Sequence, residues 1–89
     1  MNREVYASIK EELGFKPAPD AGTPKAPGAV MSVRVSDNIA YVSGHVAFSS
    51  GELMYKGRIG AEVSIEDGAK SAALSVVNCL ESLDAVVGL

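Results

Sequence analysis

Apolar and polar residues recur along this chain with two different periods, and the first stretch has the period of a helix. Tyr6, Ile9 and Leu13 follow one another at helical spacing. Asn2 precedes them as a helix-capping residue, and Gly14 follows as a residue that commonly ends helices. We therefore predict a short helix from about Asn2 to Leu13. The pattern leaves open whether this helix docks on the rest of the chain or frays at the surface.

A proline-rich segment follows the predicted helix. Residues 15–28 contain all 4 prolines of the chain. Proline fixes φ and lacks a backbone donor, so we predict an extended, non-helical connector. Segments of this length without regular structure are unusual inside compact domains. We interpret this one as an arm that wraps the body, with a flexible linker as the alternative. Residues 1–28 are thus assigned to the helix and arm, and residues 29–89 to the main domain.

After the prolines the period becomes two, which is typical of strands. We predict a strand over residues 29–35, a turn at Ser36–Asn38 and an antiparallel return at Ile39–Val42. Apolar residues on both faces of Ile39–Val42 indicate a central strand that is covered on both sides. A third extended segment is predicted at Leu53–Ile59, where Gly57 indicates a bulge or a close backbone approach.

The last element has the clearest helical signal. Ser64, followed by Glu66 and Asp67, is typical of a helix start, because the hydroxyl caps the backbone and the acids favour the N-terminal dipole. We predict a helix from about Ser64 to Val87, and we expect Gly68 to have a packing reason. An apolar stripe is predicted to face the sheet, consisting of Ala69, Ala72, Ala73, Val76, Leu80, Leu83 and Val87.

The order of these elements predicts an α+β fold: a short helix, the arm, three antiparallel strands and a long helix across one sheet face. Such a sheet would have open edges and a thin core for a chain of 89 residues. We therefore expect the chain to associate with partners, as a homotrimer or a higher assembly joined through the sheet, or to be part of a larger domain.

Charge and composition narrow the classes of function. The net charge is −3 and the 8 Lys and Arg residues are scattered, so nucleic-acid binding has little electrostatic support. The single cysteine excludes an internal disulfide and a cysteine-rich metal site. The N-terminal residues do not resemble a signal peptide, and the apolar runs are too short to span a bilayer. These features predict a cytoplasmic protein without a membrane partner or a cysteine-rich metal site.

The candidate chemistry lies where the predicted strand Ile39–Val42 ends. Gly44 allows close approach of another group, and Ser43 offers a hydroxyl that can donate and accept. His45 could act as a base, but a single histidine without other ligands cannot form a metal site. Arg58 could pair with an anionic ligand or could simply be solvated. We predict that Ser43, Gly44, His45 and Arg58 bind a small molecule.

Three stretches of the sequence resemble the Rid (reactive intermediate deaminase) family, also called YjgF-like or endoribonuclease L-PSP. They are Ile39–His45, Gly51–Gly60, and Ser64–Ala69 with the alanine-rich helix that follows, including Asn78 and Leu80. The segment from Leu13 to Pro27 resembles the start of the subgroup with a longer N-terminus. The resemblance covers nearly all of this chain, but only about the first half to two-thirds of the family's domain.

The resemblance implies a chorismate-mutase-like fold, in which helices cover one face of a mostly antiparallel sheet. It also implies a homotrimer with sites in the clefts between subunits. Family members hydrolyse enamines and imines to 2-keto acids and ammonia without a cofactor. The implied function is therefore imine or enamine deamination, and the alternative is a non-catalytic metabolite-binding or structural protein. A ribonuclease activity has only the older family label in its favour.

The chain departs from the family pattern in three respects. Residues Ala29–Met31 stand where deaminating members have a tyrosine, and His45 stands where they have a glutamine. The arginine that holds the substrate carboxylate, and the acid proposed to position water, belong to the family's later half, beyond Leu89. We therefore expect the fold to be incomplete at the C-terminus and these 89 residues alone to be an inefficient deaminase.

Overall fold

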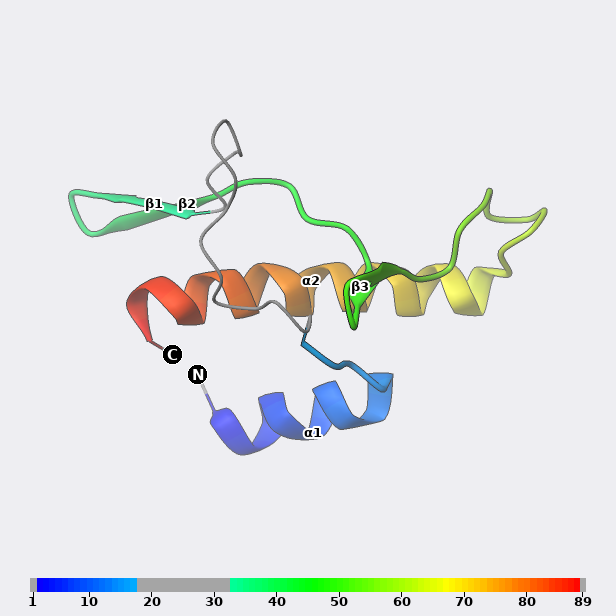
Figure 1. Cartoon of the computed structure of the whole chain (residues 1–89), viewed down its shortest axis with the longest axis horizontal. Coiled ribbons are helices and arrows are strands. Elements are labelled where there is room, and N and C mark those ends of the chain that lie inside the picture. Colours follow the sequence, from blue (N-terminus) through cyan, green and yellow to red (C-terminus); the bar gives the residue numbers. More distant parts are fainter. Residues whose placement is uncertain (1, 18–32, 89) are drawn as a thin grey trace.

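The computed structural model describes residues 2–17 and 33–88, which form two helices and two short hairpins. In order, these are α1 (Arg3–Leu13), β1 (Val33–Ser36), β2 (Ile39–Val42), β3 (Phe48–Ser49), β4 (Glu52–Leu53) and α2 (Ile65–Val87). Figure 1 shows α1 running antiparallel to α2 on one side, with the β1–β2 hairpin on the other side of α2. The coarse α+β prediction is confirmed.

The helix ends are where the sequence placed them, because their caps are local. The Asn2 side chain accepts hydrogen bonds from the backbone N–H groups of Glu4 and Val5, at 3.0 and 3.1 Å. Gly14 ends α1 in the left-handed conformation, with φ of 70°. The Ser64 hydroxyl accepts from the N–H of Asp67 at 3.1 Å and so begins α2. The open question about α1 is also answered, because its Tyr6 is buried against α2.

The β1–β2 hairpin has the predicted antiparallel pairing. Asp37 and Asn38 form its turn, both with positive φ, as a two-residue type I′ turn requires. The register pairs Val33 with Val42 and Ser36 with Ile39. Only the base of the hairpin meets α2: Val33 is buried, whereas all four residues of β2 are exposed. Within the described residues of this single chain, the prediction that Ile39–Val42 is a central strand covered on both sides is therefore wrong.

The prediction of a third strand at Leu53–Ile59 in one common sheet is also wrong for the described residues. Glu52 and Leu53 pair with β3 instead, in a separate two-stranded sheet. Tyr55 then takes a positive φ of 55°, which interrupts an extended strand. Gly57 does lie at a close approach, since a Cβ there would be 2.6 Å from the Cβ of Glu62. The start of the predicted first strand, at residues 29–32, and most of the proline arm lie outside the described residues.

The helix α2 has the predicted length but not the predicted orientation. Its buried residues are Leu74 and Val77, while Ala69, Ala72, Val76 and Val87 of the predicted stripe are exposed. The reason is that α2 lies between two partners, α1 and the hairpins, so its buried face is the one they share. Gly68 has the expected packing reason, because a Cβ there would lie 2.7 Å from the Cδ1 atom of Ile59.

Candidate functional site

The turn that follows β2 carries three of the four predicted site residues and reaches back to α2. Ser43 and Gly44 are exposed and His45 is half-buried. The imidazole Nδ1 of His45 lies 2.7 Å from the Ser43 carbonyl oxygen, and its Nε2 lies 2.8 Å from the Ser82 Oγ on α2. The ring is therefore held from both sides, by the strand end and by the helix.

These two hydrogen bonds assign the protons of the neutral ring. The carbonyl oxygen of Ser43 can only accept, so Nδ1 of His45 must carry the hydrogen and donate it. In the neutral ring Nε2 is then unprotonated and accepts from the hydroxyl of Ser82. The arrangement places a basic nitrogen against a serine hydroxyl.

Gly44, the residue before His45, has open space at its own Cβ position. A Cβ built on Gly44 would meet no other atom within 4 Å, and its φ lies outside the left-handed region. A side chain at this position would therefore project into solvent without backbone strain. A small ligand could lie in the same space, next to the Ser43–His45 turn.

Arg58 is not part of this turn within one chain. Its neighbour Ile59 packs over Gly68, near the N-terminal end of α2. Ser82, which holds His45, is 14 positions further along the same helix. At about 1.5 Å per residue, the two places are about 21 Å apart. The structure brings His45 to Ser82 on α2 and leaves Arg58 beside Ile59, near the other end of that helix.

Ser82 and Asn78 are polar residues of α2 that the site prediction did not include. The Asn78 side-chain amide donates to the carbonyl oxygens of Val46 at 3.2 Å and Phe48 at 2.9 Å. Asn78 and Ser82 are one helical turn apart, so one face of α2 holds the chain from His45 to Phe48. Their spacing of four residues, which places both on one face of the predicted helix, is a sequence signal that could have indicated this face.

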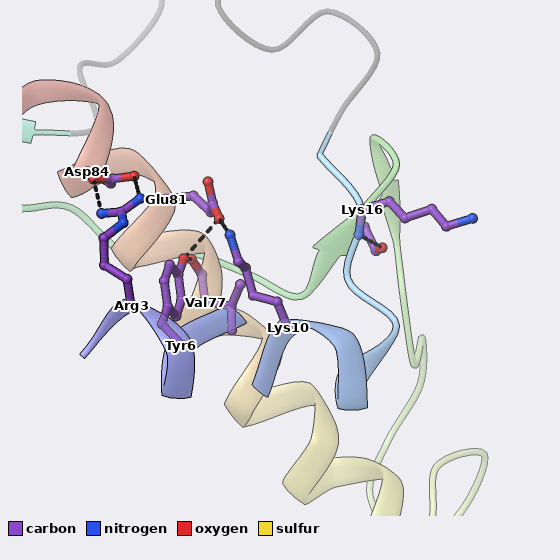
Figure 2. A network of polar contacts seen from close by, with 8 residues as sticks. Arg3, Tyr6, Lys10, Lys16, Val77, Glu81 and Asp84 are labelled. Atoms are coloured by element: carbon purple, nitrogen blue, oxygen red, sulfur yellow. Dashed lines mark hydrogen bonds and ion pairs between the residues drawn. The ribbon is translucent and has the colours of Figure 1, made fainter. Parts of the chain in front are cut away.

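A second polar cluster joins α1 to another face of α2 (Figure 2). The Tyr6 hydroxyl contacts a Glu81 carboxylate oxygen at 3.0 Å and the Val77 carbonyl oxygen at 3.3 Å. Lys10 pairs with the same Glu81 oxygen at 2.7 Å, and its ammonium lies 4.4 Å from the centre of the Tyr6 ring. Arg3 pairs with Asp84 at 3.3 Å, which also raises the pKa of the guanidinium. We call these residues the α1–α2 polar network.

The chemistry of this network is structural. Burial of Tyr6, with the hydrogen bond to Glu81 as the next cause, raises the pKa of its hydroxyl well above the usual value. The hydroxyl therefore stays protonated at neutral pH and acts as a donor, not as a base or nucleophile.

Backbone hydrogen bonds extend the attachment of α1 beyond this network. The N–H of Lys16 donates to the Ser49 hydroxyl at 3.0 Å, and the N–H of Ser50 donates to the Lys16 carbonyl at 2.8 Å. The chain after α1 is thus joined to the β3–β4 hairpin. Both sides of α2 are therefore connected to each other through residues 14–16.

Within residues 2–17 and 33–88, no three His, Cys, Asp or Glu side chains gather to hold a metal ion. No helix in these same stretches is long and apolar enough to cross a bilayer. No protein-family model, no curated protein and no solved structure matches the chain.

Proposed function

We propose that this chain is a Rid-like protein that binds a small imine, enamine or 2-keto acid beside Ser43, Gly44 and His45. The observation that carries the proposal is the open space at Gly44, the residue just before a histidine whose ring is fixed at both nitrogens. A planar metabolite needs such a flat, pre-positioned surface, and Ser43 is a polar, exposed residue at the same strand end. The chorismate-mutase-like arrangement is part of the same proposal.

We further propose that the site lies between subunits of a homotrimer. A carboxylate ligand needs a cation. In the same chain Arg58 lies beside Ile59, which packs near the N-terminal end of α2, about 21 Å along the helix from Ser82. Arg58 of a second copy could approach the turn where Arg58 of the first cannot. Association is supported by large apolar side chains that remain exposed on the β1–β2 hairpin, including Val35, Ile39 and Tyr41.

The alternative is binding without catalysis, and one observation favours it. Deamination needs an activated water and a fixed cation at the substrate carboxylate. His45 already uses both ring nitrogens in hydrogen bonds to Ser43 and Ser82, so neither is directed at a water in this arrangement. We therefore propose ligand binding as the primary property and expect deamination by these residues alone to be slow.

Calorimetry with 2-ketobutyrate tests the proposed binding site. Gly44→Val should abolish binding, because the new side chain fills the space beside His45 without straining the backbone. Ala61→Val is the matched control, since it adds bulk at an exposed position in the loop before α2 and should leave binding unchanged. Binding that survives Gly44→Val would contradict the proposed location.

Mixing two variants tests whether the site lies between copies. Gly44→Val and Arg58→Gln should each bind poorly alone. After unfolding and refolding together, about a quarter of the sites should recover, because one copy then supplies an intact turn and another an intact arginine. No recovery in a mixed assembly would argue against a shared site.

Ammonia release from freshly generated 2-aminoacrylate separates an enzyme from a binding protein. Release well above the buffer rate, lost in Gly44→Val, would establish deamination at this site. Binding of 2-ketobutyrate without ammonia release would establish the non-catalytic alternative. A folded protein with neither property would leave only a structural or interaction role.

A further inference from the structure

A serine and a histidine from distant parts of the chain meet where β2 ends against α2. The Ser82 hydroxyl lies 2.8 Å from Nε2 of His45, and Nδ1 of the same ring lies 2.7 Å from the Ser43 carbonyl oxygen. Nucleophilic serines in enzymes have this form: a hydroxyl within hydrogen-bond reach of a base, and a third group that orients the base. We propose that Ser82 is an activated nucleophile that accepts acyl groups from small esters, with His45 as its base.

The direction of the hydrogen bonds supports this assignment. Because the Ser43 carbonyl fixes the hydrogen on Nδ1, the neutral ring presents an unprotonated Nε2 to Ser82. The carbonyl of Ser43 therefore orients the ring in the tautomer that a general base requires. Asp is the usual third group in such sites, and here a backbone carbonyl takes that position.

Another serine on the same helix shows what is special about Ser82. The hydroxyl of Ser75 lies 2.9 Å from the Ser71 carbonyl oxygen, one turn earlier in α2. A carbonyl oxygen cannot take up the hydroxyl proton, so this hydrogen bond does not activate Ser75. Ser75 and Ser82 are both half-buried, and they differ in whether the hydroxyl meets a carbonyl or an imidazole.

The surroundings define the class of substrate. Ser82 and His45 are both half-buried, so an acyl carbonyl can reach them only if its substituents are small. The open space beside Gly44 can receive the rest of the molecule. Backbone N–H groups within a helix are used in helical hydrogen bonds, so the amide of Ser82 is not directed at an oxyanion. We therefore expect catalysis mainly by the base, in the range of about 10²–10⁴-fold.

The proposed reaction is balanced with water as the second substrate. Oγ of Ser82 forms a bond to the ester carbonyl carbon while Nε2 of His45 takes the hydroxyl proton. The carbon–oxygen bond to the alcohol then breaks, and the alcohol leaves with that proton. Water attacks the acylated Ser82 and gives one proton to Nε2, and the carboxylic acid leaves as Oγ recovers its proton. No electrons are transferred and no other reactant is needed.

Labelling with a fluorophosphonate, followed by intact mass and peptide mapping, tests the nucleophile. The native chain should gain one adduct at Ser82, and Ser82→Ala should gain none. Ser75→Ala is the matched control and should be labelled like the native chain. Labelling at several serines, or unchanged labelling of Ser82→Ala, would overturn the proposal. Because alanine favours helix, Ser82→Ala should retain its fold, which circular dichroism checks.

Hydrolysis of p-nitrophenyl acetate tests the role of His45 separately. The native rate should exceed that of Ser82→Ala by at least about tenfold, as expected if general-base catalysis acts through the serine. His45→Gln should lose both the hydrolysis and the fluorophosphonate adduct. An equal rate in the native chain and Ser82→Ala would show that the imidazole acts alone and would overturn the proposal. The 2-ketobutyrate experiment is independent, since it needs no acyl transfer.

Discussion

The two sides of α2 are held by different kinds of interaction. Toward α1, a buried tyrosine and paired charges form the α1–α2 polar network, with Tyr6 and Glu81 at its centre. Toward the strands, α2 makes hydrogen bonds through Asn78 and Ser82, and large apolar side chains of the hairpins stay exposed. The side of α2 that faces α1 already has its polar groups paired with α1. The other carries both the open space and the reactive groups, so it is the side on which function is expected.

Removing the shared core should have the largest effect, because both sides of α2 depend on it. Leu74 is 2% exposed, and Leu74→Ala should lower the free energy of unfolding by about 2–5 kcal/mol. Val76→Ala, two positions away and 56% exposed, should change it by less than about 0.5 kcal/mol. Urea denaturation measures both. Similar losses in the two variants would mean that the assigned buried face of α2 is wrong.

Tyr6→Phe removes one hydroxyl from the α1–α2 polar network and leaves the ring in place. The loss of its hydrogen bonds to Glu81 and Val77 should cost about 1–2 kcal/mol. Tyr41→Phe is the control. Because Tyr41 is exposed on the β1–β2 hairpin, this substitution should leave the free energy of unfolding unchanged. A loss of stability in Tyr41→Phe but not in Tyr6→Phe would mean that the α1–α2 polar network does not stabilise the fold.

The same tyrosine predicts a dependence on alkaline pH. The folded protein raises the pKa of Tyr6, so the unfolded chain releases this proton first. The stabilisation is complete below the ordinary tyrosine value of about 10 and declines as the pH rises above it. Denaturation midpoints at pH 8 and pH 11 should differ less in Tyr6→Phe than in the native chain. An identical decline in both would show that other groups cause it.

Asn78→Ala tests the strand side of α2 and should have a smaller effect. Its amide donates to the carbonyl oxygens of Val46 and Phe48, and losing these neutral hydrogen bonds should cost about 1 kcal/mol. Hydrogen exchange should become faster in residues 46–49 while α1 keeps its protection. Faster exchange in α1 instead would mean that the two sides are not independent.

The ion pair between Arg3 and Asp84 should contribute least, because the guanidinium is well exposed. Asp84→Asn should lower the free energy of unfolding by less than Asn78→Ala, and the difference from the native chain should disappear in 1 M salt, where the screening length falls to about 3 Å. Asp37→Asn, at the tip of the β1–β2 hairpin, provides a control for the charge itself. A salt-independent loss in Asp84→Asn would indicate a packing role instead.

Features set by neighbouring residues were predictable from the sequence. The caps at Asn2 and Ser64 and the stop at Gly14 each depend on a few adjacent backbone groups. The turn at Asp37 and Asn38 is equally local, because these residue types tolerate positive φ. These local signals were enough to predict the helix bounds and the β1–β2 hairpin.

Features set by distant partners were not predictable in the same way. The helical period predicts that the stripe including Ala72 and Val76 is buried. The buried residues are instead Leu74 and Val77, because they lie on the face of α2 that both of its partners cover. The site prediction did not include Ser82, because 37 positions separate it from His45 in the sequence and only the fold brings the two side chains together. A periodic pattern shows that a helix has an apolar face without showing which face is covered.

The most direct test of the strand-side site uses the fact that the chain has a single histidine. A long-range ¹H–¹⁵N correlation spectrum, recorded where the ring is neutral, reports which imidazole nitrogen of His45 carries the hydrogen. The account predicts Nδ1–H, with Nε2 accepting from Ser82, and a shift of the Nε2 resonance in Ser82→Ala but not in Ser75→Ala. A ring protonated at Nε2, or one whose spectrum is indifferent to Ser82, would contradict it.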